Sequence, residues 1–386
     1  MSGPLLIIFL TILVNLIGFG IIIPLLPFYA ETFGASPLTV GLLFASFSLA
    51  QLFASPVLGA WSDKWGRRPV LIFSLVGTVV SFVMLALAHN LAMLFAARIV
   101  DGLSGGNITT ARAYIGDIAT DENRARSFGM LGAAFGLGFI IGPALGGLFA
   151  HISYTAPIWA AAAITVLATL LAWFWLPETV HRVDAAAGSP WKALRELSGR
   201  ASLRRLFAID FLYWGSFAVY QTTFALFGAR RFGFDAAGTG YLLAAFGFLG
   251  VIVQVLMVGP VVKRLGETRT LVVGLLFAAV GWGGSALTYS LPLFIAMLVP
   301  GAIGIGLCNP AIVSLVSSAA GRHEQGRVQG AAGALESLGR TLGPIWGNGA
   351  LQFLGEGAAY GSAAVVLLLT AALTTGYEKP RTTPAS

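Results

Sequence analysis

Two pairs of oppositely charged residues lie well inside apolar stretches of this sequence. Arg98 and Asp101 are spaced i, i+3, and Glu336 and Arg340 are spaced i, i+4, so each pair can share one face of a helix. A charge in an apolar segment is costly and indicates function by default. An acid that loses its basic partner in one conformation becomes easier to protonate, so either pair could carry a proton. A permanently paired structural couple is the alternative for both.

Residues that could bind a metal or form a catalytic set are sparse. The chain has one cysteine, Cys308, inside an apolar stretch, and its four histidines are scattered. It also lacks the glycine-rich, lysine-containing loop that binds nucleotides. The sequence therefore predicts no metal site, no cofactor and no enzymatic activity.

The composition indicates that these charged pairs lie in a membrane. Of the 386 residues, 57% are apolar and only 10% are Asp, Glu, Lys or Arg, too few charges to cover a soluble protein of this size. Apolar stretches long enough to cross a bilayer recur along the chain, and the first lacks the features of a cleaved signal peptide. The predicted fold class is an all-α membrane protein with twelve transmembrane helices in two six-helix pseudo-symmetric bundles, and the spans are 5–30, 38–61, 70–88, 91–114, 127–150, 155–177, 205–229, 236–260, 270–288, 291–315, 328–352 and 357–376.

The basic residues lie in short loops, which indicates a lipid bilayer and no nucleic acid as partner. If both termini are on one side, nearly all loop Lys and Arg fall there, and only Arg230 and Arg231 lie opposite. The positive-inside rule then predicts a multi-pass protein of the cytoplasmic (inner) membrane with both termini cytoplasmic.

The longest loop divides the predicted chain into an N-terminal six-helix bundle 1–177, a cytoplasmic linker 178–204 and a C-terminal six-helix bundle 205–386. Apolar and basic residues alternate in this linker. That pattern suits a helix on the membrane surface, and a partly helical linker is an equal alternative.

Two groups of residues recur in the second half of the chain, at offsets of 200 and 201 residues. A coincidence of two offsets indicates duplication of a six-span unit, a plan in which substrate binds near the membrane midplane between the halves. The repeated positions are Gly59 and Gly66 with Gly259 and Gly266, and residues 138–146 with 339–347. In the second copy Lys263 replaces Asp63, so that copy cannot form the same charge cluster.

Four motifs lie in or between the predicted spans: Asn15-Leu-Ile-Gly18-Phe-Gly20-Ile-Ile-Ile-Pro24-Leu-Leu-Pro27, Gly59-x-x-x-Asp63-Lys-x-Gly66-Arg67-Arg68, Arg98-x-x-x-Gly102-x-x-Gly105, and Gly138-x-x-x-Gly142-Pro143-x-x-Gly146-Gly147. Together they resemble the major facilitator superfamily over essentially the whole chain. Within that family they are similar to the twelve-span drug/proton antiporters that include the tetracycline exporters.

The resemblance implies roles for these motifs. Asp63, Arg67 and Asp117 would form a charge cluster that locks the cytoplasmic helix ends in the outward-open state. A simple positive-inside anchor is the alternative. The glycines around Pro143 would form a hinge and a tight helix seal, with ordinary helix packing as the alternative. Arg98 would take part in coupling.

The sequence departs from the tetracycline exporters at two places. Those proteins carry an acid at the position of Asn15 and another in the third span, where this chain has none. Either Asp101 or Glu336 replaces those acids, or the driving ion or the substrate differs.

Aromatic residues at helical spacing in the seventh span suit the wall of a cavity for a mostly apolar ligand. Helix or lipid contact is the alternative. The predicted cavity residues are Tyr213, Phe217, Tyr220, Gln221 and Phe224, with the intramembrane amides Asn15, Gln51, Asn107, Gln254 and Asn309.

Together these features predict a monomeric secondary transporter that exports an amphipathic small molecule in exchange for protons, by alternating access. The alternative is a facilitator or proton symporter of a sugar or organic anion, in which Arg98, Arg112 and Arg340 would bind a carboxylate. A sensor without transport activity is a further alternative.

Overall fold

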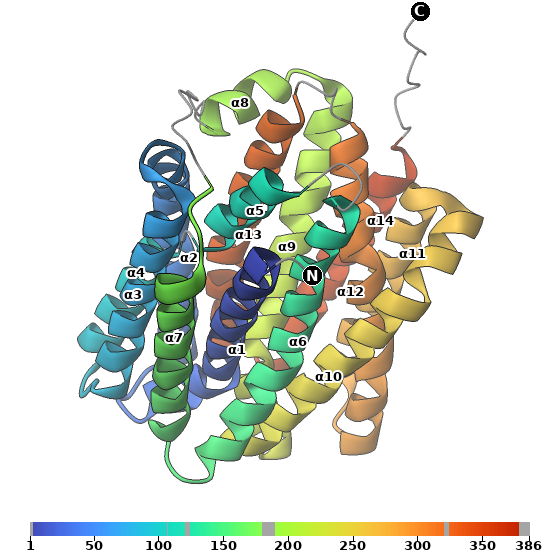
Figure 1. Ribbon diagram of the computed structural model, residues 1–386. Coiled ribbons are helices and arrows are strands. Elements are labelled where there is room, and N and C mark those ends of the chain that lie inside the picture. The colour runs from blue at the N-terminus through green and yellow to red at the C-terminus, as the bar shows by residue number, and fades with distance from the viewer. Residues whose placement is uncertain (1–2, 106, 120–123, 180–189, 320–323, 378–386) are drawn as a thin grey trace, which may run out of the picture. The chain divides into compact units, whose positions relative to one another are not determined.

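We describe the protein from a computed structural model that covers residues 3–105, 107–119, 124–179, 190–319 and 324–377. Within these ranges the chain is helical and contains no strand (Figure 1). The helices are α1 Gly3–Glu31, α2 Pro37–Trp65, α3 Arg67–Ala86, α4 Leu91–Ser104, α5 Asn107–Ile118, α6 Arg124–Ala150, α7 Ala156–Trp175, α8 Pro190–Leu197, α9 Ala201–Phe232, α10 Ala236–Leu256, α11 Val258–Leu287, α12 Leu291–Ser318, α13 Gln325–Phe353 and α14 Glu356–Thr375.

Nine of the described helices are long and apolar enough to cross a membrane, which agrees with a multi-pass protein. The other three predicted spans are also helical, but their helices are shorter or less apolar than these nine. The fourth is divided between α4 and α5, while α9 and α13 contain charged residues within their apolar stretches. The number twelve therefore remains a prediction.

The predicted span over 91–114 consists of two helices in the structure. α4 ends at Ser104, and α5 begins at Asn107. The side-chain nitrogen Nε2 of Gln51 on α2 donates to the carbonyl of Gly105, at 2.9 Å. That carbonyl is thus satisfied by a side chain where a continuous helix would have used a backbone N–H.

A second boundary also differs from the sequence prediction. The eighth span was placed at 236–260, but α10 ends at Leu256, and α11 runs from Val258 through a bend at Gly266. Gly266 has a φ of 75°, a left-handed conformation that glycine adopts without steric cost.

The described chain forms two compact units. Unit 1 comprises Met1–Ala187 and Thr222–Phe248, and unit 2 comprises Gly188–Gln221 and Leu249–Ser386. Most of each unit follows the chain order, but α9 and α10 contribute residues to both. The predicted division of the chain into two six-helix bundles, joined by the linker 178–204, remains a prediction.

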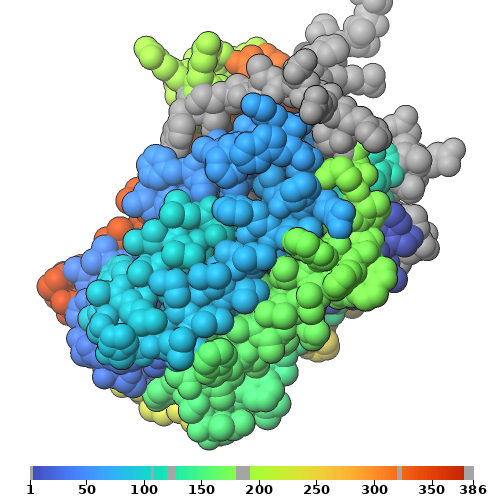
Figure 2. Space-filling view, turned by 60° about the vertical axis from the view of Figure 1, so that its left-hand side comes forward, coloured from blue at the N-terminus to red at the C-terminus, as the bar shows by residue number. Residues whose placement is uncertain are grey.

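α1 occupies the centre of unit 1, where it packs on α6 and α7. Its buried residues occur on every face, so a helix with no amphipathic pattern becomes a core helix. α3 and α7 lie side by side on one face of this unit, together with α4 (Figure 2). Large apolar side chains such as Phe73, Leu167 and Phe174 are exposed there, as expected for a face in contact with lipid.

In unit 2, α11 packs along both α12 and α14 (Figure 1). Trp282 of α11 is fully buried and stacks on Tyr220 of α9, with ring centroids 5.1 Å apart. Tyr360 of α14 lies against the same Tyr220 ring, at 5.4 Å. This aromatic stack connects three helices in the core of unit 2.

Glycines bring α6 into backbone contact with α1. A Cβ atom on Gly142 would lie 2.7 Å from the Cα atom of Gly20 and 2.8 Å from the carbonyl oxygen of Ile17. Gly138 and Gly146 face α1 in the same way, whereas Gly147 does not. Small residues at this spacing allow helix backbones to approach closely without a hydrophobic driving force in lipid.

We expect Gly142→Ala to destabilise the protein by about 1–3 kcal/mol, because the added methyl group must displace the α1 backbone. The matched control is Gly132→Ala on the same helix, where a Cβ atom would meet nothing within 4 Å. Thermal unfolding in detergent, followed by tryptophan fluorescence, measures both variants. Equal Tm values for the two would contradict the close contact between α1 and α6.

Candidate functional site

The signature loop between α2 and α3 forms a charge cluster around Arg67. Its guanidinium group bonds to Asp63 one turn earlier, and its Nε atom lies 3.0 Å from the Oδ2 atom of Asp117 on α5. Arg67 also donates to the hydroxyl of Ser62, at 2.7 Å. One half-buried arginine thus connects the ends of α2, α3 and α5.

Glu178 is a member of this cluster that the sequence analysis did not identify. Its carboxylate accepts from the backbone N–H groups of Arg67, at 2.9 Å, and of Arg68, at 3.1 Å. These N–H groups begin α3, where the helix dipole favours an anion. The sixth predicted span ends at Pro177, and the acid that directly follows it was the signal available in the sequence.

The other residues of the signature loop, Arg68, Gly66 and Gly59, differ in what they contact. Arg68 donates to the carbonyl oxygen of Trp173 at the end of α7. Gly66 has a φ of 111° and separates α2 from α3, so a residue with a side chain would be strained there. A Cβ atom on Gly59 would meet nothing within 4 Å. Packing at Gly59 therefore does not require glycine.

The second copy of the loop has the same backbone turn with opposite charges. Gly266 corresponds to Gly66 and also has a positive φ. Lys263 takes the place of Asp63, and Glu267 takes the place of Arg67. Glu267 accepts from the hydroxyl of Ser314 on α12. The repeat therefore preserves the turn, while the charge cluster belongs to the first copy.

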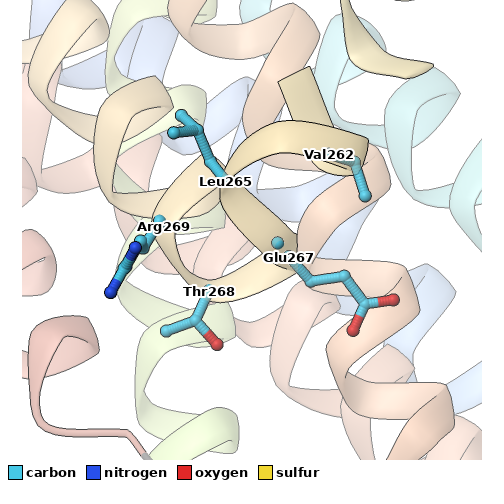
Figure 3. A pocket seen from close by; sticks show the side chains of 6 residues that line it. Val262, Leu265, Glu267, Thr268 and Arg269 are labelled. Atoms are coloured by element: carbon cyan, nitrogen blue, oxygen red, sulfur yellow. The ribbon is translucent and has the colours of Figure 1, made fainter. Parts of the chain in front are cut away.

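An open pocket of about 430 Å³ lies at this second turn (Figure 3). It is shallow and lined by one short stretch of α11. Arg269 and Glu267 project from opposite sides of the turn in this view, so they do not converge on a common point. Its lining residues are Val262, Leu265, Gly266, Glu267, Thr268 and Arg269.

Arg98 and Asp101 form the most deeply buried ion pair of the described chain. Arg98 Nη1 lies 2.8 Å from Asp101 Oδ2, and the two residues are 1% and 5% exposed. The guanidinium group also lies over the ring of Phe47 on α2, at 4.3 Å from its centroid. Thr78 of α3 hydrogen-bonds to the carboxylate. The pair is thus enclosed by α2, α3 and α4.

Glu336 and Arg340 also form an ion pair, within one turn of α13. This pair is half-buried rather than buried. Arg340 stacks on Trp214 of α9, at 4.3 Å from the ring centroid. Asp210, one turn before Trp214 on α9, is buried near this pair.

Most side chains of the predicted aromatic wall of α9 are buried in this structure, and their role as a cavity wall remains a prediction. Tyr213, Tyr220 and Phe224 are 1%, 2% and 0% exposed. Tyr220 is stacked between Trp282 and Tyr360, so it has no free face for a ligand. Helical spacing alone could not distinguish a core stripe from a cavity stripe, because both repeat every 3.6 residues.

Phe217 and Gln221 are half-buried. Phe217 stacks on Tyr213, at 6.4 Å between ring centroids. These two residues keep accessible surface on α9 that a ligand could contact.

The predicted cavity amides have different environments. Asn15 is buried among Thr11, Leu71 and other residues of α1, α3 and α5. Gln51 donates to the Gly105 carbonyl, as described above. Gln254 is exposed and Asn309 half-buried, while the side chain of Asn107 lies outside the described residues. A common cavity for these five amides therefore remains a prediction.

The described part of the linker packs on unit 2. Leu197 of α8 is buried, and α8 lies against α13. Arg200 donates two hydrogen bonds to Glu324, at 2.6 and 2.9 Å, which raise the pKa of Arg200 and lower the pKa of Glu324. Arg327 pairs with Glu196 beside them. The apolar face predicted to contact lipid thus contacts protein at Leu197.

Glu178→Ala should lower the free energy of unfolding by about 1 kcal/mol, since two N–H groups of α3 lose their acceptor. Its control is Glu196→Ala, which removes an exposed ion pair that we expect to contribute less. Thermal unfolding in detergent compares the two. A larger Tm loss in Glu196→Ala would contradict the capping role of Glu178.

Comparison with known proteins agrees with this arrangement. The Major Facilitator Superfamily matches residues 8–344 and 206–385. The chain is 34% identical over 353 residues to "Tetracycline resistance protein, class C" of Escherichia coli, covering 89% of this chain and 88% of that one. It is 30% identical over 346 residues to "Multidrug resistance protein 2" of Bacillus subtilis (strain 168), covering 87% and 86%.

A solved structure is also similar over nearly the whole length. The human organic anion transporter MFSD10 (TETRAN) superposes with a TM-score of 0.76 at 25% identity, covering 96% of this chain and 99% of that one. The family match, the relatives and the helical membrane fold together exclude an enzyme. This chain belongs to the Major Facilitator Superfamily and is a membrane transporter.

Proposed function

We propose that this protein exports amphipathic small molecules from the cell in exchange for protons. Its relatives are named for resistance to tetracycline and to multiple drugs, which supports drug export. The observation that carries the proton coupling is the buried Arg98–Asp101 ion pair. We place the carrier in the cytoplasmic membrane with both termini in the cytoplasm, and the halves 1–177 and 205–386 alternate access.

Asp101 can serve as a proton carrier because its charge depends on one neighbour. While Arg98 contacts it, the carboxylate is stabilised as an anion in a site that excludes water. A conformation that draws Arg98 away leaves an unpaired buried acid, which then takes up a proton. When Arg98 returns, the proton leaves, so protonation alternates with conformation.

The expected driving force follows from the membrane potential. Exchange of one proton for a neutral substrate gains about 2.3 kcal/mol per 100 mV. Because each 1.4 kcal/mol is a factor of ten, this supports a concentration ratio of about 40. A monovalent cationic substrate exchanged for one proton would be driven by the pH difference alone.

The cluster around Arg67 would act as the cytoplasmic gate. It joins the ends of α2, α3 and α5 through one guanidinium group, with Asp63 and Asp117 as its acceptors. An exposed ion pair contributes about 1 kcal/mol or less, but a half-buried network with several partners can bias a two-state equilibrium further. We propose that this cluster stabilises the state in which the cytoplasmic ends are closed.

The alternative, transport of an organic anion, has support from the name of the similar human transporter. It would require an arginine free to bind a carboxylate. In the structure Arg98 is engaged by Asp101 and Phe47, and Arg340 by Glu336 and Trp214. Arg112, the third arginine of this alternative, lies exposed on α5 rather than in a buried site. Export of a mostly apolar molecule makes no such demand, and we favour it.

Proton release from proteoliposomes tests the proposed antiport. The vesicles contain a trapped pH dye and an imposed pH gradient, and receive tetracycline or another amphipathic drug. We expect drug-dependent proton movement that Asp101→Asn abolishes, while exchange of labelled for unlabelled drug continues. Because Arg98 loses its counter-charge, at a cost of about 3 kcal/mol, the variant's Tm must be recorded alongside. Absence of proton movement with every drug would reject antiport and favour a facilitator.

Asp63→Asn should reduce transport about ten-fold or more, because loss of a charge-assisted bond costs about 1.5–3 kcal/mol of the gated state. The control is Lys64→Gln, which changes the charge of an exposed neighbour. Flux of labelled drug into inverted vesicles measures both, and thermal unfolding shows that both fold. Normal flux in Asp63→Asn would refute the gate.

A further inference from the structure

A buried acid outside the two predicted pairs lies in unit 2. Asp210 of α9 is 4% exposed. α9 begins at Ala201, so about two and a half turns separate Asp210 from the start of the helix. An acid at this depth needs either a cationic partner or a proton.

The groups that act on Asp210 come from three helices. Trp214 of α9 hydrogen-bonds to its carboxylate, and Glu336 and Arg340 of α13 interact with it through their charges. Tyr213 of α9 and Cys308 of α12 belong to the same neighbourhood. The neighbourhood therefore contains two carboxylates and one guanidinium group.

Close packing of α9 on α13 holds these groups together. A Cβ atom on Gly339 would lie 2.9 Å from the backbone nitrogen of Gly215 and 3.0 Å from the carbonyl oxygen of Phe211. Arg340 follows Gly339 directly and stacks on Trp214. Asp210 precedes Phe211, so the backbone contact leaves little freedom to move the acid away from Glu336 and Arg340.

The charge balance of this cluster is incomplete without a proton. One guanidinium group cannot neutralise two ionised carboxylates, and the surplus negative charge would lie in a buried site. Arg340 is already paired with Glu336, and Asp210 is a buried acid that has no ion pair of its own among the described residues. We propose that Asp210 holds one proton beside the Glu336–Arg340 ion pair, and that this cluster is a proton-binding site of the carrier.

The two acids have different access to water. Glu336 is half-buried, with 28% of its side chain exposed, and Asp210 is buried. A proton would therefore enter and leave through Glu336. This cluster also differs from Asp101, which has Arg98 to itself and must lose that partner to bind a proton. The Asp210–Glu336 cluster can bind a proton with its ion pair intact.

This inference rests on the proposed proton antiport, and its test separates the two. Purified protein in weakly buffered detergent with a pH dye receives tetracycline, and the protons released per bound drug are counted. Drug binding is measured in parallel by tryptophan fluorescence. The variants are Asp210→Asn and Glu336→Gln. The matched control is Asp235→Asn, an exposed acid whose carboxylate accepts from the backbone N–H of Gly238 at the start of α10.

We expect the wild type and Asp235→Asn to release the same number of protons. Asp210→Asn should release one fewer per drug bound, and Glu336→Gln should lose the same proton. An unchanged count in Asp210→Asn, with drug still bound, would overturn the proposal and leave the antiport intact. Drug binding without any proton release in the wild type would reject the antiport, and the proposed site with it.

A measurement on the wild type avoids the risk that Asp210→Asn fails to fold. Dicyclohexylcarbodiimide reacts with protonated carboxyl groups in apolar surroundings, and mass spectrometry locates the modified residue. We expect modification at Asp210 or Glu336 that decreases as the pH rises and when tetracycline is bound. Absence of modification at both residues, while other acids react, would overturn the proposal.

Discussion

Arg98 lies in an apolar helix bundle with 1% of its surface exposed, and the carboxylate of Asp101 is what allows it to remain there. A charge removed from water must find its counter-charge inside the protein, because lipid offers none. α2, α3 and α4 enclose the pair: Phe47 of α2 contacts the guanidinium group, and Thr78 of α3 contacts the carboxylate. Any movement that separates the pair must supply a proton or a new partner, which makes the same contact both structural and suited to transport.

Helices in lipid have no hydrophobic driving force for packing, and glycine compensates by letting their backbones approach closely. α6 contacts α1 through Gly138, Gly142 and Gly146, and α13 contacts α9 through Gly339. Both contacts bring backbone against backbone, and the second also holds Arg340 and Asp210 in one neighbourhood. Close helix packing thus determines which charged groups can interact.

The two copies of the signature loop keep the same backbone turn and differ in charge. Gly66 and Gly266 both adopt a positive φ, so the turn before the next helix is preserved. In the first copy an arginine joins two acids, and in the second Glu267 accepts from a serine hydroxyl. The same turn therefore carries different interactions in the two copies.

The sequence by itself determined the membrane location, the helical class, the family motifs and the spacing of both ion pairs. These follow from composition and from the geometry of a single helix, in which residues three or four apart must be neighbours. Contacts between helices were decided only by the tertiary structure. Glu178 caps α3, Gln51 satisfies Gly105, and Gly339 packs on Gly215, each across a long separation in sequence. The stacking of Tyr220 on Trp282 was decided in the same way: helical periodicity shows which residues share a face, but only packing decides what that face touches.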